Sequence, residues 1–265
     1  MIKAAVLGSP ISHSLSPLLH KTAYDFLGIA NSYEAIEVTE EKFEDFFKAN
    51  SVLDWTGFSL TMPLKEVAIQ LVDEVDEEAK KINSVNTIFK KDAKWCAKST
   101  DLLAFENIFA ELNFDRVAVI GGGGTARAAI GALGKYVTEV DVLLRSDFRI
   151  PALMSAGDVL KVNPVRMNSD LNRYDLVIST TPVGANDELA RSIKSVGGIF
   201  FDVLYKPIES ELAKAWTSAG GSTINGLVLL VEQAIFQIEI FSKVHFDHSK
   251  MRELLLSTGK SALGI

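Results

Sequence analysis

Residues 116–128 read Arg-Val-Ala-Val-Ile-Gly-Gly-Gly-Gly-Thr-Ala-Arg-Ala, an apolar run followed at once by glycines. The run over 116–120 is typical of a parallel strand that is covered on both faces. Glycines after such a strand allow a tight turn and leave room for a pyrophosphate, and the N-terminus of a following helix adds N–H donors and its positive dipole end. The stretch therefore predicts a dinucleotide-binding loop. Its Gly-x-Gly-Gly spacing departs from the full Gly-x-Gly-x-x-Gly pattern, so a glycine-rich turn without a ligand is the alternative.

Comparable apolar runs follow this loop at 140–144, 176–179 and 199–203. Helix-compatible segments at 125–135 and 188–195 lie between them. Strands and helices that alternate in this way predict a doubly wound parallel sheet.

The first third of the chain also alternates strand-like and helix-like segments, which predicts a separate α/β layer structure. The expected strands are 3–8, 32–38, 57–61, 86–91 and 94–99, and the expected helices are 16–27, 40–48 and 76–82. A helical segment at 102–112 can connect the two parts, and helices at 226–242 and 249–256 follow the second. No Pro- or Gly-rich linker separates the parts, so we expect ordered structure between them.

Composition limits the classes of function. The chain has 265 residues, of which 48% are hydrophobic and 23% charged, enough to bury a core. A formal net charge of −7 argues against holding nucleic acid by a general electrostatic field. The single cysteine, Cys96, excludes an internal disulfide, and no convincing set of metal ligands is present. No signal-like segment and no bilayer-length apolar stretch is apparent, so a cytoplasmic globular protein without a membrane partner is expected.

The loop at 145–149, Arg-Ser-Asp-Phe-Arg, follows the second strand expected after the connecting segment. In dinucleotide-binding folds an acidic residue at this point binds the ribose of NAD, whereas an arginine accommodates the 2′-phosphate of NADP. Arg145 and Arg149 can clasp a phosphate, with Ser146 as a further donor. NADP is therefore favoured, while Asp147 keeps NAD possible and a solvated basic loop is the alternative.

The segment 8–20 places several hydroxyl groups directly after the first expected strand, where they can hold a small polar ligand. It can equally be a strand-to-helix connection, with Ser16 as N-cap and Pro17 at the first helical position. Both interpretations can hold together.

Short motifs follow one another in a fixed order along the chain. They are Gly8–His20 (GSPISHSLSPLLH), Ser59–Lys65 (SLTMPLK), Ser84–Ile88 (SVNTI), Thr100-Asp101, Gly121–Gly124, Ser179–Gly184 (STTPVG), Asp202–Pro207 (DVLYKP) and Gly226–Ala234 (GLVLLVEQA). In this ordered set, which spans nearly the whole chain, the sequence closely resembles the shikimate dehydrogenase family.

The resemblance implies an N-terminal α/β substrate domain, formed by 1–101 and 226–265, and a doubly wound Rossmann domain that binds NADP, formed by 102–225. It also implies reversible NADP-dependent reduction of 3-dehydroshikimate to shikimate, a step of aromatic-amino-acid and chorismate biosynthesis. The small-molecule substrate would be the partner, and the enzyme would be a monomer or a homodimer.

The resemblance also assigns site residues. Lys65 and Asp101 would form the catalytic pair. The substrate-binding residues would be Ser14 and Ser16 at the carboxylate, Thr61, Asn86 and Gln233 at ring hydroxyls, and Tyr205 in the cleft. The cofactor-binding residues would be Gly121, Gly122, Gly123, Gly124, Thr125, Ala126, Arg145, Ser146, Arg149, Thr181 and Gly226.

Ketone reduction needs such a catalytic pair, because hydride delivered to carbon leaves an alkoxide that requires a proton. A lysine ammonium can stabilise or protonate that oxygen, and a neighbouring carboxylate can position the lysine. Either member can transfer the proton. Taken singly, Lys65 is equally an exposed lysine at a helix start and Asp101 a helix N-cap, so only the motifs favour catalysis. His13 and His20 are expected to serve packing and local hydrogen bonding.

Some positions depart from the usual family pattern. Ser99 and Leu102 replace an asparagine and a glycine on either side of Thr100-Asp101, which predicts an altered backbone or polarity around Asp101. Leu144, Ala185 and Leu229 replace an asparagine and two methionines.

Other functions remain open. They are an NAD-dependent quinate/shikimate dehydrogenase, a non-catalytic dinucleotide- or ligand-binding paralogue, and an enzyme of the methylenetetrahydrofolate dehydrogenase type. The presence of Lys65 and Asp101 argues against the second, and Ser14, Ser16 and Gln233 argue against the third.

Overall fold

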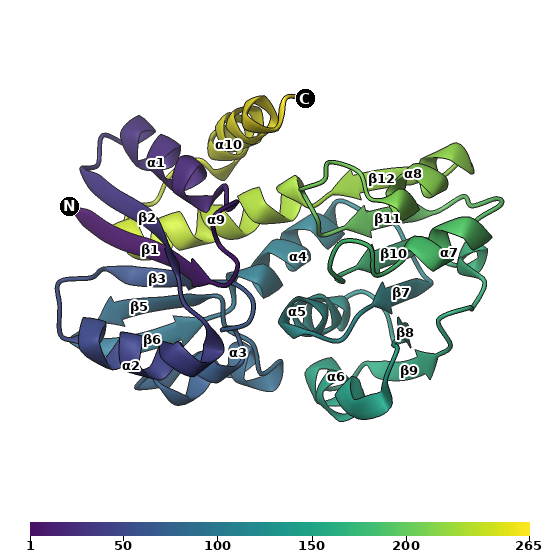
Figure 1. Ribbon diagram of the computed structural model, residues 1–265, viewed down its shortest axis with the longest axis horizontal. Coiled ribbons are helices and arrows are strands. Elements are labelled where there is room, and N and C mark those ends of the chain that lie inside the picture. Colours follow the sequence, from purple (N-terminus) through teal and green to yellow (C-terminus); the bar gives the residue numbers. More distant parts are fainter. The chain divides into compact units, whose positions relative to one another are not determined.

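The computed structural model describes residues 1–265, which form two α/β units (Figure 1). Unit 1 contains Met1–Ala104 and Leu230–Ile265, and unit 2 contains Phe105–Leu229. The chain leaves unit 1 within helix α4 (Thr100–Ala110) and returns within helix α9 (Leu227–Ser242). Unit 2 is therefore an insertion into the sequence of unit 1, and both connections are helical.

Unit 1 has a mixed sheet in the order β2-β1-β3-β5-β6-β4. Its strands are β1 (Ile2–Gly8), β2 (Asn31–Glu37), β3 (Gly57–Leu60), β4 (Glu74–Val75), β5 (Thr87–Lys91) and β6 (Lys94–Lys98). Strand β1 pairs in parallel with β2 and β3, and β5 pairs antiparallel with β3 and β6. The β5–β6 turn has positive φ at Asp92 and Ala93, as a two-residue type I′ hairpin requires.

Helices cover both faces of this sheet. They are α1 (Ser16–Phe26), α2 (Glu40–Ser51), α3 (Glu77–Lys81), α9 and α10 (His248–Leu263), with a short 3₁₀ turn η1 (Val67–Gln70). Phe43 and Phe47 lie one turn apart on α2 and join Phe58 of β3 in an apolar cluster. The next strand residue, Ser59, points to the opposite face, where its hydroxyl contacts Gln237 of α9. That second face is therefore partly polar, and the predicted site residue Gln233 lies on the helix covering it.

Unit 2 has an all-parallel sheet in the order β12-β11-β10-β7-β8-β9. Its strands are β7 (Val117–Ile120), β8 (Glu139–Leu143), β9 (Lys161–Val165), β10 (Leu176–Ser179), β11 (Ile199–Asp202) and β12 (Ser222–Asn225). The first three strands of the unit run outward from β7 and the last three run outward from β10. This is the strand order of the Rossmann fold, and its direction reverses between β7 and β10.

Helices pack on both faces of the unit 2 sheet as well. They are α5 (Gly124–Leu133), α6 (Ile150–Gly157), α7 (Asp187–Ser192) and α8 (Glu211–Ser218), with 3₁₀ turns η2 (Asp147–Arg149) and η3 (Leu171–Arg173). Phe200 contacts Trp216 of α8, whereas the next residue, Phe201, contacts Phe105 of α4. Successive strand residues point to opposite faces, so α4 and α8 lie on opposite sides of this sheet. Figure 1 shows α5 and α6 side by side.

Every predicted strand and helix is present, with ends shifted by a few residues. The last helix was predicted too short, because α10 continues to Leu263 before Gly264 ends it in a left-handed cap. Five elements were not predicted from the sequence: β4, β9, β12, α6 and α8. The three strands are short and partly polar, and each lies at an edge of its sheet, so they lack a buried apolar pattern.

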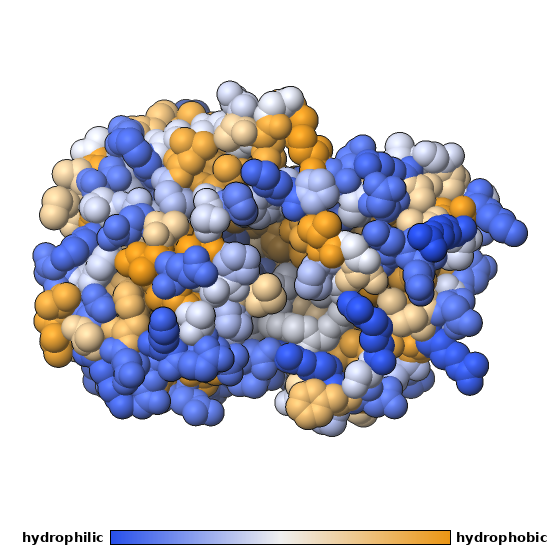
Figure 2. All heavy atoms as spheres, viewed as in Figure 1, coloured by the Kyte–Doolittle hydropathy of each residue, from blue (hydrophilic) through white to orange (hydrophobic).

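Hydrophilic residues cover most of the face shown in Figure 2, and apolar residues form small separate groups on it. None of the helices has both the length and the apolar character that crossing a bilayer requires.

Candidate functional site

The predicted catalytic residues Lys65 and Asp101 meet in unit 1. Lys65 lies in the turns after β3, and Asp101 is in the first turn of α4. The Lys65 Nζ atom donates to Asp101 Oδ2 at 2.6 Å, and the two side chains are only 16% and 7% exposed. A pair this shielded is held in one geometry more firmly than a surface ion pair. The two residues are thus placed together, as catalysis would require, although they are 36 positions apart.

Asn86 connects this pair to its surroundings. The backbone N–H of Thr100 donates to Asn86 Oδ1 at 2.7 Å, which fixes the orientation of the Asn86 amide because a backbone N–H can only donate. The opposite end, Asn86 Nδ2, then donates to Asp101 Oδ1 at 2.8 Å and to Gln233 Oε1 at 3.3 Å. Four predicted site residues therefore form one hydrogen-bonded cluster.

The departures beside Asp101 have a local explanation. The Ser99 hydroxyl accepts from Leu102 N–H at 3.4 Å, the contact of an N-cap residue with the third residue of α4. Serine and asparagine both serve well as N-caps, so this exchange keeps the start of the helix. Leu102 lies inside α4 and is 4% exposed, where a leucine side chain is accommodated in the core. Both residues therefore fit the regular start of the helix that carries Asp101.

Ser14, Ser16 and Thr61 lie beyond the carboxyl ends of β1 and β3. These strands are parallel neighbours, so the segments that follow them start at the same edge of the sheet. A Cβ atom built on Gly8 would lie 2.3 Å from Thr61 Cγ2, which places Thr61 directly against the end of β1. No bond joins the hydroxyls of Ser14, Ser16 or Thr61 to the Lys65 cluster in this structure.

The prediction that Ser16 is the N-cap of α1 was wrong by one residue, because Leu15 is the N-cap. Ser16 is already the first helical residue, and its N–H donates to the Ser14 hydroxyl at 3.2 Å. Ser14 is partly exposed, whereas Ser16 is 6% exposed.

The two histidines of this segment differ. His20 is fully buried, stacks on Tyr33 with ring centroids 4.0 Å apart, and contacts Tyr24 and Gln237. Burial lowers the pKa of His20 to about 3, so its ring is neutral. The expectation of packing and hydrogen bonding is confirmed for His20 and wrong for His13, which is exposed.

The glycine loop lies in unit 2, between the end of β7 and the start of α5. Gly121 has a φ of +113°, and a Cβ atom there would lie 2.4 Å from the Thr180 hydroxyl. Thr180 follows β10, and its N–H and hydroxyl both donate to Ile120 O. The loop is therefore at the point where the strand order reverses, which is the usual ligand site of this fold.

The start of α5 has the form that a phosphate site needs. Gly123 is the N-cap residue and has open space where a Cβ would lie. The first i→i−4 hydrogen bond of the helix runs from Arg127 N–H to Gly123 O at 3.1 Å. The N–H groups of Gly124, Thr125 and Ala126 come before this bond and belong to the first turn, whose N–H groups lack an acceptor inside the helix. The Ala126 methyl is fully buried, so only its backbone can face a ligand. These groups fit a pyrophosphate, whose charge the helix dipole favours.

The basic loop lies against the glycine loop. A Cβ atom on Gly122 would be 2.9 Å from Arg149 Cβ and 3.1 Å from Leu144 Cδ2. Arg145 and Ser146 are exposed, and the Ser146 hydroxyl accepts from Phe148 N–H. The residues predicted to contact a 2′-phosphate are thus close in space to those predicted to contact the pyrophosphate.

The remaining predicted residues of unit 2 lie after β10, β11 and β12. The Thr181 hydroxyl accepts from Asn186 Nδ2 at 2.8 Å. Gly226 is buried, and a Cβ there would lie 2.1 Å from Val203 O, so close packing alone requires glycine. Tyr205 is partly exposed in the segment after β11.

Four polar residues beside the predicted site residues were not predicted from the sequence. Thr87 and Thr100 bond the Asn86 amide, and buried Gln237 bonds Thr87 and the backbone of Asn86. In unit 2, the fully buried Arg127 donates to Gly122 O at 3.4 Å. Gln237 carried a usable signal, because it lies one helical turn beyond Gln233 and only apolar residues, 234–236, separate the two.

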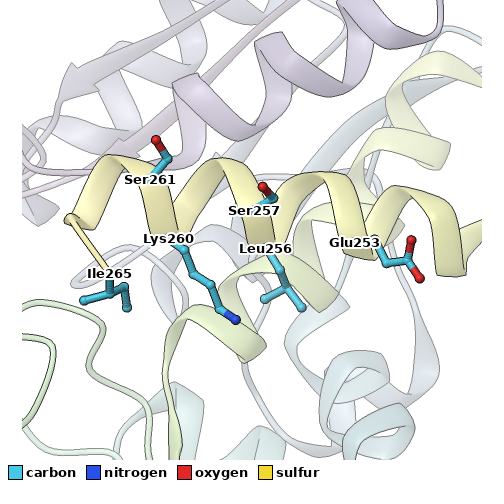
Figure 3. Close-up of a pocket in the computed structure, with 6 residues that line it drawn as sticks. All are labelled: Glu253, Leu256, Ser257, Lys260, Ser261 and Ile265. Atoms are coloured by element: carbon cyan, nitrogen blue, oxygen red, sulfur yellow. The ribbon is translucent and has the colours of Figure 1, made fainter.

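An open groove of about 620 Å³ runs along α10 (Figure 3). Its lining consists of Glu253, Leu256, Ser257, Lys260, Ser261 and Ile265. None of these is a predicted site residue. The groove therefore has no bearing on the clusters around Lys65 and Gly121.

Comparisons with known proteins identify the family of the chain. The family model described as "Shikimate dehydrogenase substrate binding domain" matches residues 6–88. A shikimate dehydrogenase (NADP(+)) of Staphylococcus epidermidis is 30% identical over 273 residues, covering 99% of each chain. The crystal structure of Mycobacterium tuberculosis shikimate dehydrogenase has a TM-score of 0.88 and 31% identity, covering 97% of this chain and 100% of that one. Shikimate 5-dehydrogenase of Thermus thermophilus, solved in complex with NADP(H) and shikimate, has a TM-score of 0.84 and 28% identity, with 97% and 100% covered. The chain belongs to the shikimate dehydrogenase family.

Proposed function

We propose that this protein catalyses the reversible, NADP-dependent reduction of 3-dehydroshikimate to shikimate. The observation that carries the proposal is the shielded Lys65–Asp101 pair, bonded through Asn86 to Gln233. Membership of the family and the named activity of its relatives support the choice of substrate and cofactor. The role would be a cytoplasmic step of aromatic-amino-acid biosynthesis.

Unit 1 supplies the groups for the substrate. Ser14 and Ser16 bind the carboxylate, and Thr61, Asn86 and Gln233 bind ring hydroxyls. The Lys65 ammonium donates a hydrogen bond to the substrate oxygen and stabilises the charge that develops there. Asp101 holds the ammonium in place, and the pair assists transfer of the proton.

Unit 2 supplies the groups for the dinucleotide. The amides at Gly121–Ala126 bind the pyrophosphate, and Arg145, Ser146 and Arg149 bind the 2′-phosphate. Thr181 and Gly226 are further cofactor-binding residues of this unit. When bound, the nicotinamide supplies the hydride.

The first test is a set of initial rates for purified protein with shikimate or quinate, each with NADP or NAD. A dominant rate with shikimate and NADP is expected. Comparable rates with quinate or NAD would replace the proposal with a broader quinate/shikimate dehydrogenase. No rate with any pair, from protein shown to be folded, would contradict an oxidoreductase role on these substrates.

A further inference from the structure

Gln237 lies on α9, is 1% exposed, and uses all the hydrogen-bonding capacity of its amide. Its Nε2 atom donates to the backbone oxygen of Asn86 and to the Thr87 hydroxyl, both at 3.0 Å. Because a backbone carbonyl can only accept, this contact fixes which end of the amide faces Asn86. The Oε1 atom therefore faces the opposite way, where Ser59 Oγ lies at 2.7 Å and His20 Nε2 at 3.2 Å.

The fixed orientation of the Gln237 amide determines which atoms donate and which accept among the neighbouring buried side chains. Gln237 Oε1 accepts, so His20 carries its proton on Nε2 and its Nδ1 atom accepts from the Tyr24 hydroxyl. The Tyr33 hydroxyl donates to Ser59 at 2.7 Å, and Ser59 donates onward to Gln237. Burial raises the pKa of both tyrosines and lowers that of His20, so these groups stay neutral and keep their roles at physiological pH.

On the side of Gln237 that faces Asn86, the hydrogen bonds run from donor to acceptor in the same direction. The Thr87 hydroxyl accepts from Gln237 and donates to Asn86 Oδ1 at 3.1 Å, while Asn86 Nδ2 donates to Asp101. Gln237 thus contacts Asn86 twice, directly at its backbone and through Thr87 at its side chain. Hydrogen bonds aligned in one direction polarise one another, and this series ends on the carboxylate that holds Lys65.

Resting on the function proposed above, we infer that Gln237 is a positioning residue, which fixes Asn86 and, through it, the orientation of Asp101 and Lys65 toward the substrate oxygen. The side chain is buried behind Asn86 and does not contact substrate itself. Its donated hydrogen bonds, rather than its volume, are the property that matters for turnover.

Two substitutions separate donation from volume. Gln237→Glu keeps the size and the accepting oxygen but removes the NH₂ donors, and Gln237→Met keeps the approximate volume without either function. With shikimate and NADP, both are expected to lower kcat about tenfold or more, since small misplacement of a catalytic group has effects of this size. The KM for NADP should stay within about twofold, because the cofactor groups lie in unit 2. Ile238→Val, a fully buried change on the same helix, is the control and should retain kcat.

The route through Asn86 is tested by a double-mutant cycle. In an Asn86→Ala background, Gln237→Met should lower kcat by less than about twofold, because the side chain it positions is gone. An equal loss in both backgrounds, or near wild-type kcat in either folded Gln237 variant, would overturn the positioning role. If Gln237→Met does not fold, Gln237→Glu and the milder Ser59→Ala, which removes one donor to Gln237, are measured in the same cycle. A wild-type protein that turns over neither shikimate nor quinate would overturn the proposed function and the positioning role together. An active wild type with fully active Gln237 variants would overturn the positioning role alone.

Discussion

Asp101 receives a hydrogen bond on each carboxylate oxygen, from Lys65 on one and from Asn86 on the other. A carboxylate bound on both oxygens has little freedom to rotate, so the ammonium it holds is directed to one place. The precision of the site therefore resides in Asn86 and the threonines around it as much as in the ion pair.

Lys65→Ala is expected to lower kcat by about 10²–10⁴, the usual contribution of a positioned acid or base. NADP binding should change little, because the predicted cofactor groups belong to unit 2. Steady-state kinetics together with a dissociation constant for NADP would measure both effects. Lys80→Ala removes a half-exposed lysine as a control, and near-normal turnover in the Lys65 variant would remove Lys65 from the mechanism.

Arg145→Ala should weaken NADP binding about tenfold to a hundredfold and NAD binding hardly at all, since a charge-assisted bond contributes about 1.5–3 kcal/mol. Titration of the folded protein with each cofactor gives the comparison. Arg166→Ala, at another exposed arginine of unit 2, is the matched control. Equal weakening of both cofactors would refute a contact between Arg145 and the 2′-phosphate.

At the scale of elements, the start of α4 is decisive, because this helix presents Asp101. Ser99 supplies the cap of the helix in place of the asparagine usual in the family. The geometry of the site thus depends on Ser99, whose hydroxyl bonds the Leu102 N–H rather than Lys65 or Asp101.

Ser99→Ala should lower the free energy of unfolding by about 1 kcal/mol, the usual loss of an N-cap, whereas Ser99→Asn should be close to neutral. Urea unfolding of the two variants beside the wild type measures the difference. An alanine variant as stable as the wild type would show that the Ser99 hydroxyl does not cap α4.

The sequence predicted the central elements because their own residues determine them. The run at 117–120 is apolar throughout, and glycines end it. Edge strands such as β12 (Ser222–Asn225) depend on a neighbour for their conformation and carry no such pattern. The same limit applies to the site, where motifs pointed to Lys65 and Asp101 but no local rule places them 2.6 Å apart. Helical spacing marks Gln237 only as the next glutamine on the face of Gln233, and it does not reveal the bonds of Gln237 to Ser59 and Thr87, which belong to distant strands.

At the scale of the whole molecule, contacts of α9 tie together distant parts of unit 1. His20 of α1 contacts Gln237, 217 positions away, and Glu232 of α9 is paired with Arg252 of α10. Unit 1 is therefore stabilised by buried polar groups as well as by its apolar core, and one of them makes stability depend on pH.

His20 has a pKa of about 3 in the folded protein, below its unfolded value of about 6.5, so it takes up its proton on unfolding. Its contribution is complete above about pH 6.5 and is lost as pH falls toward the folded pKa. Between about pH 7.5 and pH 5.0 the loss should be about 2 kcal/mol. His20→Gln should reduce this part of the pH dependence, measured by urea unfolding at both pH values, whereas His13→Gln at an exposed position should not. An unchanged slope in the His20 variant would contradict a neutral, buried His20.

The insertion of residues 105–229 into unit 1 imposes an order on biosynthesis. A ribosome releases β1 to β6 first, then the whole of unit 2, and only then most of α9, which carries Gln233 and Gln237, and α10. At about 5–20 residues per second, the first sheet and α1 wait roughly 6–25 s for α9 and α10, which complete the cover of the second face. During that interval the nascent chain holds a contiguous unit 2 that can already fold, and a first sheet whose second face is still incompletely covered and open to chaperones. Translation speed over residues 105–229 therefore sets how long the emerging enzyme is exposed to aggregation.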